Sequence, residues 1–226
     1  MNNRTPLLIS VAIVVAMIAA GSWAWTTLPP GSQIPIHFDI HGNPNGFAEA
    51  PVGLFMMPAI AALISVLFIA LPKIEPRRFN LVHSAKFYHA SWIGVVLLMA
   101  AMHATILYSA TNGGAPGGGI IIVGVCLLII VIGNYLGKTR SMFLGGIRTP
   151  WSLTSEYSWQ RTHSLAGKLF MLSGIAGFVA AFVFSTLAAL EILIATLFLA
   201  IGISVTMSYV YWRHDPDRQT GDAAPG

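Results

Sequence analysis

Charged residues are scarce in this sequence. Only 9% of the 226 residues are Asp, Glu, Lys or Arg, whereas a soluble domain has about 25%. Hydrophobic residues make up 55% of the chain, and the mean hydropathy is +0.73. Because too few polar side chains are present to cover a globular surface, an ordinary soluble enzyme is excluded. The single cysteine, Cys126, excludes a disulfide framework and a cysteine-based zinc site.

Long apolar segments predict an all-α membrane protein. A helix needs about 20 apolar residues to cross the hydrocarbon core of a bilayer. Six segments meet this requirement and predict six transmembrane helices, at about 7–28, 52–71, 87–109, 119–136, 165–186 and 190–211. The last two are almost continuous, and the predicted turn between them lies at 186–190. Trp23 and Trp25 near the end of the first segment are typical of an interfacial belt, so we expect this segment to be retained rather than cleaved as a signal peptide.

Positive charge is absent from one side of this topology. The connections 29–51, 110–118 and 187–189 contain no Lys or Arg, so all twelve cations fall on the other side. The positive-inside rule makes that side cytoplasmic and places both termini there. The high pI of about 9.5 is then explained by topology and by the anionic lipid of the inner surface. No direct contact with nucleic acid is expected.

Three regions follow along the chain. Residues 1–71 hold the first two spans and the outer loop 29–51, residues 72–118 hold the third span with its connections, and residues 119–226 hold spans four to six. The last region includes a polar cytoplasmic loop at 137–164.

The outer loop has the pattern of a short strand. Apolar residues at 34, 36, 38 and 40 alternate with Pro35, His37, Asp39 and His41, and the segment 43–46 predicts a turn. Two imidazoles flanking a carboxylate have a spacing that could coordinate zinc or copper, with His103 as a further ligand. The alternative is a solvated polar strand face, and no metal or other cofactor is assigned.

The inner end of the fourth span carries two glycines and an amide. Gly133 and Gly137 are four residues apart, which favours close helix contact within the membrane. Asn134 lies between them and needs a polar partner. It is either an interhelical hydrogen-bonding residue or part of a functional site.

The inner loop contains a helix break and a helix start. Gly145 and Gly146 break any helix, and Thr149 can cap a new one with Pro150 in its first turn. A short interfacial helix is predicted to carry the aromatic residues Trp151, Tyr157 and Trp159.

Two interpretations of this loop remain open. Its aromatic residues are either membrane anchors or part of a binding site, and Arg148 either reaches lipid phosphate or has a specific role. A polar site could also include Glu156, Arg161 and His163. These residues form no recognisable nucleophile–base set, so no catalytic residue is assigned.

Four inner motifs carry a family resemblance: Gly133-Asn134, Gly137-Lys138, Gly146-Ile147-Arg148-Thr149-Pro150-Trp151, and Trp159 with Thr162-His163. They resemble the signature of the SdpI family, bacterial immunity proteins against a sporulation-delaying toxin. The outer segments Pro35-Ile36-His37-Phe38 and Gly42-Asn43-Pro44-Asn45-Gly46 are similar to the domain of unknown function that precedes this signature. The chain departs from that pattern at Glu49-Ala50-Pro51, where a basic residue is expected.

The resemblance implies a six-span protein of the bacterial inner membrane that protects its host from a secreted membrane-active peptide. It also implies capture of a small cytoplasmic repressor. The implied partner-binding residues are Asn134, Arg148, Thr149, Pro150, Trp151, Trp159 and His163, and those that would meet the toxin are His37, Asp39 and His41.

Two other functional classes are less favoured by the sequence. A small transporter would need ionisable groups within its spans, and only His89, His103 and Glu191 qualify, all towards span ends. A membrane enzyme would depend on His163 with Glu156. We expect a non-enzymatic protein.

Overall fold

The fold is seen in a computed structural model that describes residues 1–39, 41, 43–113 and 119–217. Among these residues six helices are long and apolar enough to cross a membrane, so the prediction of six spans is confirmed. They are α1 (Arg4–Thr27), α2 (Ala50–Ile74), α4 (Ala85–Asn112), α5 (Gly119–Leu136), α7 (Glu156–Val183) and α8 (Thr186–Arg213). Two short helices, α3 (Arg78–His83) and α6 (Pro150–Thr154), lie between them.

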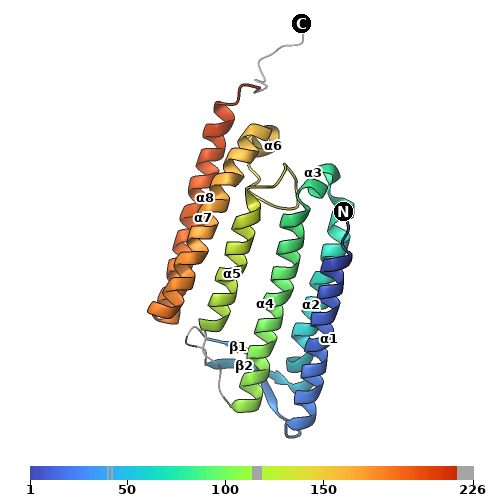
Figure 1. The fold of residues 1–226 in the computed structure, drawn as a ribbon. Helices are drawn as coiled ribbons and strands as arrows, with labels where there is room; N and C mark the ends of the chain where they lie inside the picture. The colour runs from blue at the N-terminus through green and yellow to red at the C-terminus, as the bar shows by residue number, and fades with distance from the viewer. Residues whose placement is uncertain (40, 42, 114–118, 218–226) are drawn as a thin grey trace.

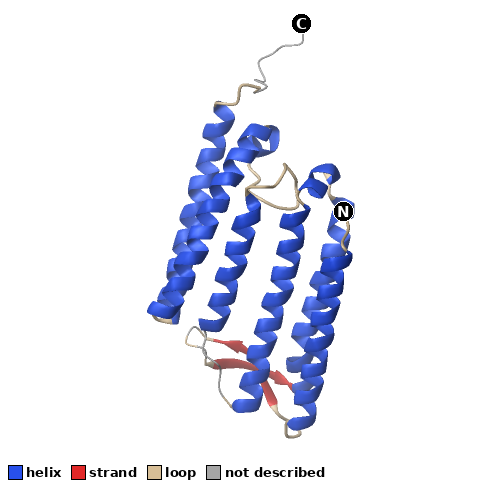
Figure 2. Cartoon of the chain, in the orientation of Figure 1, coloured by secondary structure: helices blue, strands red, loops and turns tan. Residues whose placement is uncertain are grey.

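The spans form two groups that lie side by side (Figure 1). Helices α1, α2 and α4 pack on one another, as do α5, α7 and α8, and the contact between α4 and α5 joins the groups. The first helix begins and the last helix ends at the same end of the bundle, together with α3 and α6. The two strands lie at the opposite end (Figure 2).

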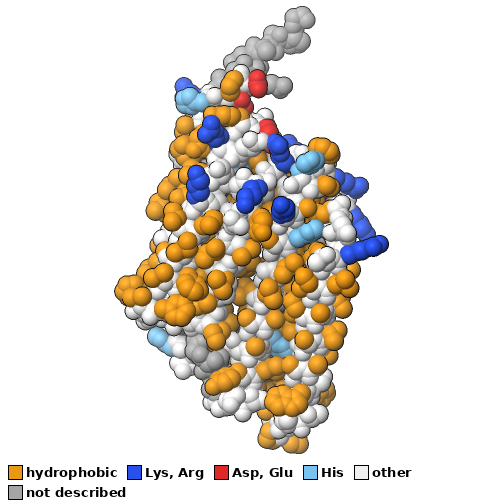
Figure 3. All heavy atoms as spheres, viewed as in Figure 1, with side chains coloured by type: hydrophobic (Ala, Val, Ile, Leu, Met, Phe, Trp, Pro, Cys, Tyr) orange, Lys and Arg blue, Asp and Glu red, His pale blue; other side chains and the backbone are white. Residues whose placement is uncertain are grey.

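The charges are distributed as the sequence indicates. In Figure 3 the Lys and Arg side chains gather at the end where α1 begins, whereas the visible flank of the bundle below them is hydrophobic. Large apolar side chains such as Leu63, Phe182 and Phe198 are exposed on the spans, as expected for a surface in contact with lipid. Arg218 lies outside the described residues.

The outer loop forms an antiparallel hairpin of β1 (Gln33–Phe38) and β2 (Pro44–Glu49), which confirms the predicted strand. Ile34 anchors the hairpin on α2: it is only 1% exposed, and a Cβ added to Gly53 would lie 2.4 Å from its Cβ. The absence of a side chain at Gly53 therefore lets β1 lie directly on the helix.

The predicted turn of the hairpin is wrong in position. Pro44 begins β2, so the connection lies before it, and the backbone N–H of Asp39 donates to the carbonyl of Asn43 at 2.9 Å. Pro35 is buried, although the alternation placed it on the polar face. Ile40 and Gly42, which the prediction also used, lie outside the described residues.

Two predicted boundaries in the C-terminal half are also corrected. The turn between the last spans lies at Phe184 and Ser185, earlier than 186–190, because the Ser185 side chain caps α8 by accepting the Ala188 N–H at 3.2 Å. The predicted interfacial helix through Trp151 and Trp159 is broken at Ser155, so only Trp151 lies in α6.

Glycines bring α5 and α7 into backbone contact, as the pair Gly133 and Gly137 predicts. A Cβ on Gly133 would lie 2.7 Å from the carbonyl oxygen of Gly167, and one on Gly167 would lie 2.6 Å from that of Gly133. Gly174 continues the contact, with the Cys126 carbonyl oxygen 2.8 Å from its built Cβ. Small residues replace the hydrophobic effect as the basis of helix association within a membrane.

We predict that Gly167→Ala destabilises the protein, because the new methyl group meets backbone that cannot rotate away. Overpacking of this kind costs about 1–3 kcal/mol. The control is Gly202→Ala on α8, where an added Cβ has no neighbour within 4 Å. Thermal unfolding of the detergent-solubilised variants should show a lowered transition for Gly167→Ala only. Equal transitions would contradict the close α5–α7 packing.

Candidate functional site

A buried carboxylate at the end of α2 holds the inner loop, residues 137–149, in place. Glu75 is 1% exposed, and its carboxylate accepts the backbone N–H of Leu144 at 2.8 Å and that of Phe143 at 3.1 Å. It also accepts the N–H of Arg77 at 2.9 Å. A buried carboxylate is tolerated when such donors satisfy it, so Glu75 links the end of α2 to the loop.

Helix α3 and the residues on either side of it add three further bonds to the same loop. The Asn80 amide donates to the Ser141 carbonyl at 2.7 Å, and the Ser84 hydroxyl accepts the Arg140 N–H at 2.9 Å. The Arg77 guanidinium donates to the Ser141 hydroxyl. The loop is therefore tied to the first half of the chain as well as to its own flanking helices.

Trp159 and His163 lie one turn apart on α7, are fully buried, and stack with ring centroids 3.8 Å apart. The Trp159 indole donates to the Thr139 carbonyl at 3.1 Å. The Ile147 N–H donates to Nε2 of His163 at 2.8 Å, and Nδ1 lies 2.8 Å from the Trp159 carbonyl. Since a carbonyl only accepts, Nδ1 carries the proton and the imidazole is neutral with both nitrogens satisfied.

Gly146 is the position where the loop passes over this imidazole. Its φ of +101° lies in the left-handed region, and a Cβ built there would lie 2.3 Å from Nε2 of His163. The residue therefore requires glycine for two independent reasons, conformation and space.

Thr149 and Pro150 start helix α6 as the sequence predicts. The Thr149 hydroxyl accepts the Ser152 N–H at 3.1 Å, the Ser152 hydroxyl accepts the Thr149 N–H at 3.0 Å, and Pro150 occupies the first turn. The Thr149 hydroxyl also lies 2.9 Å from that of Ser208 on α8. This capping box explains the residue types by local helix geometry.

Among the inner candidates Asn134, Arg148, Pro150 and Trp151 are accessible, whereas Thr149, Trp159 and His163 are buried. Arg148 is exposed and donates to the Phe143 carbonyl at 2.5 Å, and Trp151 is half-buried against Tyr209, with centroids 5.1 Å apart. Asn134 is exposed on α5, and no described residue accepts or donates a hydrogen bond to its amide. Of the two alternatives for Asn134, the interhelical hydrogen bond is therefore not formed with any described residue.

The outer candidates do not form one cluster. The Asp39 carboxylate accepts the backbone N–H groups of Asn43 at 2.8 Å and His41 at 2.9 Å, and the first of these bonds holds the pKa of Asp39 below its ordinary value. His37 contacts the Asn45 amide. His103 instead donates from Nε2 to the Leu54 carbonyl at 3.0 Å. The described residues contain no group of three His, Cys, Asp or Glu side chains able to hold a metal ion.

An apolar pocket lies behind the hairpin. It has a volume of about 400 Å³ and is open to the surface between β1 and helices α4, α5 and α8. Its apolar lining includes Phe38, Met102, Val125 and Leu190, with His37, Asp39 and Thr186 as polar lining residues. This pocket could not be predicted from sequence patterns, because its residues come from four separate elements.

Comparison with known proteins matches both halves of the chain. Residues 138–211 match the SdpI/YfhL protein family, and residues 12–62 match a domain of unknown function, DUF1648. The resemblance to the SdpI family is confirmed. The chain is 28% identical to the immunity protein SdpI of Bacillus subtilis (strain 168) over 208 residues, which cover 91% of this chain and 95% of that protein. No solved structure matches.

The segment that matches the SdpI family, in the C-terminal half, contains Trp159 and His163 as buried supports of the loop. Arg148 and Trp151 lie on the surface of the same segment. Glu75, which lies outside that half, was missed by sequence reasoning. The only signal for it is an acidic residue directly after an apolar span, between Lys73 and Arg77. The pair His163 and Glu156 is not formed, since Glu156 is exposed and pairs with Arg140 at 3.3 Å.

We predict that Gly146→Ala displaces the loop from His163. The substitution combines left-handed strain of about 1–2 kcal/mol with overpacking of about 1–3 kcal/mol. The control is Gly113→Ala, which has a φ of +74° but no atom within 4 Å of the added Cβ, so it reports strain alone. Limited proteolysis of the inner loop should be faster in Gly146→Ala than in Gly113→Ala. Equal rates would contradict the close contact between Gly146 and His163.

Proposed function

We propose that this chain is an immunity protein of the bacterial inner membrane that protects its host from a secreted membrane-active peptide, with both termini in the cytoplasm. The observation that carries the proposal is the similarity to the immunity protein SdpI, which covers both halves of the chain and nearly the full length of that relative. The gathering of cations at the end where α1 begins supports the orientation.

The apolar pocket behind the hairpin is the proposed site for the peptide. In the proposed orientation it opens at the outer face, next to a hairpin loop that lacks Lys and Arg. Apolar side chains of a membrane-active peptide match its lining. His37, Asp39 and Thr186 contribute polar side chains at this site, and the exposed His41 follows the first two in the loop. Protection would then follow from capture of the peptide at the outer surface.

The inner loop is the proposed surface for a cytoplasmic repressor. Arg148 and Trp151 are accessible there, whereas Trp159, His163 and Thr149 hold the loop in shape from beneath. In this proposal the buried residues act only by positioning the exposed ones.

The comparisons favour this function over a transporter or an enzyme. The similar protein is named as an immunity protein. The imidazoles of His103 and His163 each bond to backbone groups of neighbouring elements, so both have structural roles in the described fold. Neither supports a proton pathway or acid–base chemistry.

We predict that expression of this chain protects a Bacillus subtilis strain that lacks its own SdpI against the sporulation-delaying toxin. Val125→Phe, which fills the pocket, should abolish protection, whereas Val131→Phe on the lipid-exposed face of the same helix should not. Growth in the presence of toxin measures the effect, with membrane levels of each variant checked by immunoblot. No protection by the wild-type chain would refute the proposed immunity function. Equal growth of the two variants would refute the pocket as the binding site of the peptide.

The inner surface is tested separately. Arg148→Ala and Trp151→Ala should leave toxin protection intact but release a repressor from the membrane fraction of the same strain. Loss of protection without release would assign these residues to immunity instead of signalling.

A further inference from the structure

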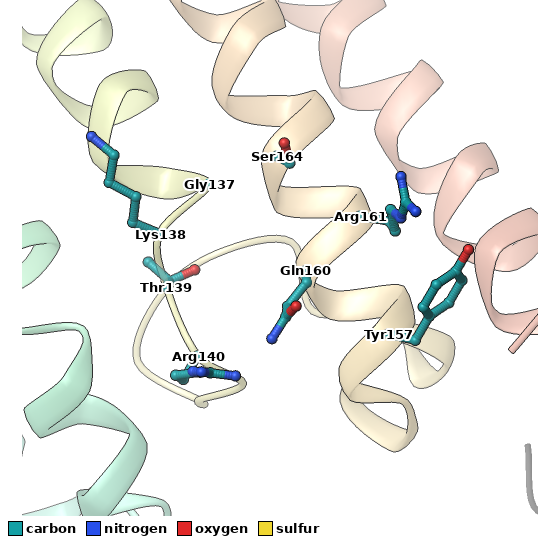
Figure 4. A pocket seen from close by; sticks show the side chains of 8 residues that line it. All are labelled: Gly137, Lys138, Thr139, Arg140, Tyr157, Gln160, Arg161 and Ser164. Carbon is teal, nitrogen blue, oxygen red and sulfur yellow. The ribbon is translucent and has the colours of Figure 1, made fainter. Parts of the chain in front are cut away.

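The end of the bundle that bears the cations contains a second pocket, distinct from the exposed face of Arg148 and Trp151. It has a volume of about 420 Å³ and lies between the loop that follows α5 and the first turns of α7. Figure 4 shows the loop side chains on one side and those of α7 on the other. The lining residues are Gly137, Lys138, Thr139, Arg140, Tyr157, Gln160, Arg161 and Ser164.

Positive charge dominates this pocket. Lys138, Arg140 and Arg161 line it, and among the described residues the one carboxylate that pairs with them is Glu156, which lies 3.3 Å from Arg140. The Lys138 ammonium lies 5.3 Å from the centre of the Tyr135 ring, and the Arg161 guanidinium 5.4 Å from that of Tyr157. Aromatic rings position these two cations without neutralising them, and no described carboxylate pairs with either, so each wall keeps one positive charge for a ligand.

Specific contacts hold the two walls of the pocket together. Thr139 in its floor is buried and accepts the indole N–H of the buried Trp159 on its carbonyl. The close approach of Gly137 to Ser164, 3.1 Å from a built Cβ to the Ser164 Cα, fixes the separation of its two walls. The buried Thr139 and the approach of Gly137 to Ser164 therefore hold the two walls in a fixed relation.

Its depth indicates the source of the ligand. The pocket lies where α5 ends and α7 begins, so it sits at the edge of the apolar spans, where lipid headgroups are found. Tyrosines are typical of this depth. Fixed cations with hydroxyl and amide neighbours match a phosphate that carries negative charge.

We propose that this pocket binds the phosphate-bearing headgroup of an anionic lipid. The proposal goes beyond toxin protection and does not depend on it. Lys138 and Arg161 supply the charge, and Gln160 and Ser164 supply neutral polar groups. A lipid held here contacts the loop and α7 together and adds an interaction between them.

The test uses the full-length protein in a neutral detergent, titrated with dioctanoyl phosphatidylglycerol and followed by native mass spectrometry. The double variant Lys138→Gln/Arg161→Gln should weaken binding by at least about tenfold, since each cation near an anionic surface contributes about fivefold. Lys73→Gln/Arg78→Gln removes the same charge from exposed positions outside the pocket and should bind like the wild type. The variant Lys138→Arg/Arg161→Lys keeps the charge and should restore most of the affinity.

Three results would overturn the proposal. The first is equally weakened lipid binding in the two glutamine variants, and the second is equally tight binding of dioctanoyl phosphatidylcholine. The third is displacement of the lipid by inorganic phosphate at the lipid's own concentration, which would assign the pocket to a soluble anion. Size-exclusion profiles and thermal transitions identify variants that fail to fold. If the double variant does so, Lys138→Gln and Lys73→Gln are compared instead. A negative toxin assay leaves this outcome untouched.

Discussion

The hydrogen bond from the Ile147 N–H to Nε2 of His163 sets the position of the inner loop. To make this bond, the loop must pass directly over the imidazole at Gly146. Gly146 leaves no room for a Cβ. The Trp159 carbonyl fixes the other ring nitrogen, so the ring can neither rotate nor change tautomer without losing a bond. His163 and Glu75 accept N–H groups of buried or half-buried loop backbone, which would otherwise lack a protein partner.

The same face of α7 also carries the tight helix packing. His163 is followed one turn later by Gly167 and two turns beyond by Gly174, so the imidazole and the glycines share one stripe. This stripe faces α5, where Gly133 meets Gly167 backbone to backbone. Any movement of α5 against α7 must therefore separate two backbones in contact, and the loop above is attached to both helices.

The sequence predicts the features that depend on composition and on local geometry. Span number, the one-sided charge, the strand and the Thr149 cap all follow from neighbours within a few residues. The turn at Ser185 was misplaced because apolar residues surround it and only a single capping hydroxyl identifies it. The role of Glu75 could not be predicted, because its partners Phe143 and Leu144 lie almost 70 positions further along the chain.

The candidate site shows the same division. The family resemblance implies its residues, and the fold separates them into buried residues that support the loop and accessible residues on its surface. Trp159 and His163 are buried because an indole and an imidazole at positions i and i+4 can stack and still reach loop backbone. Arg148 cannot share that environment, since an unpaired buried guanidinium is too costly, and it stays at the surface. Substitution of a support residue therefore alters the displayed surface as a whole, whereas substitution of Arg148 removes one contact.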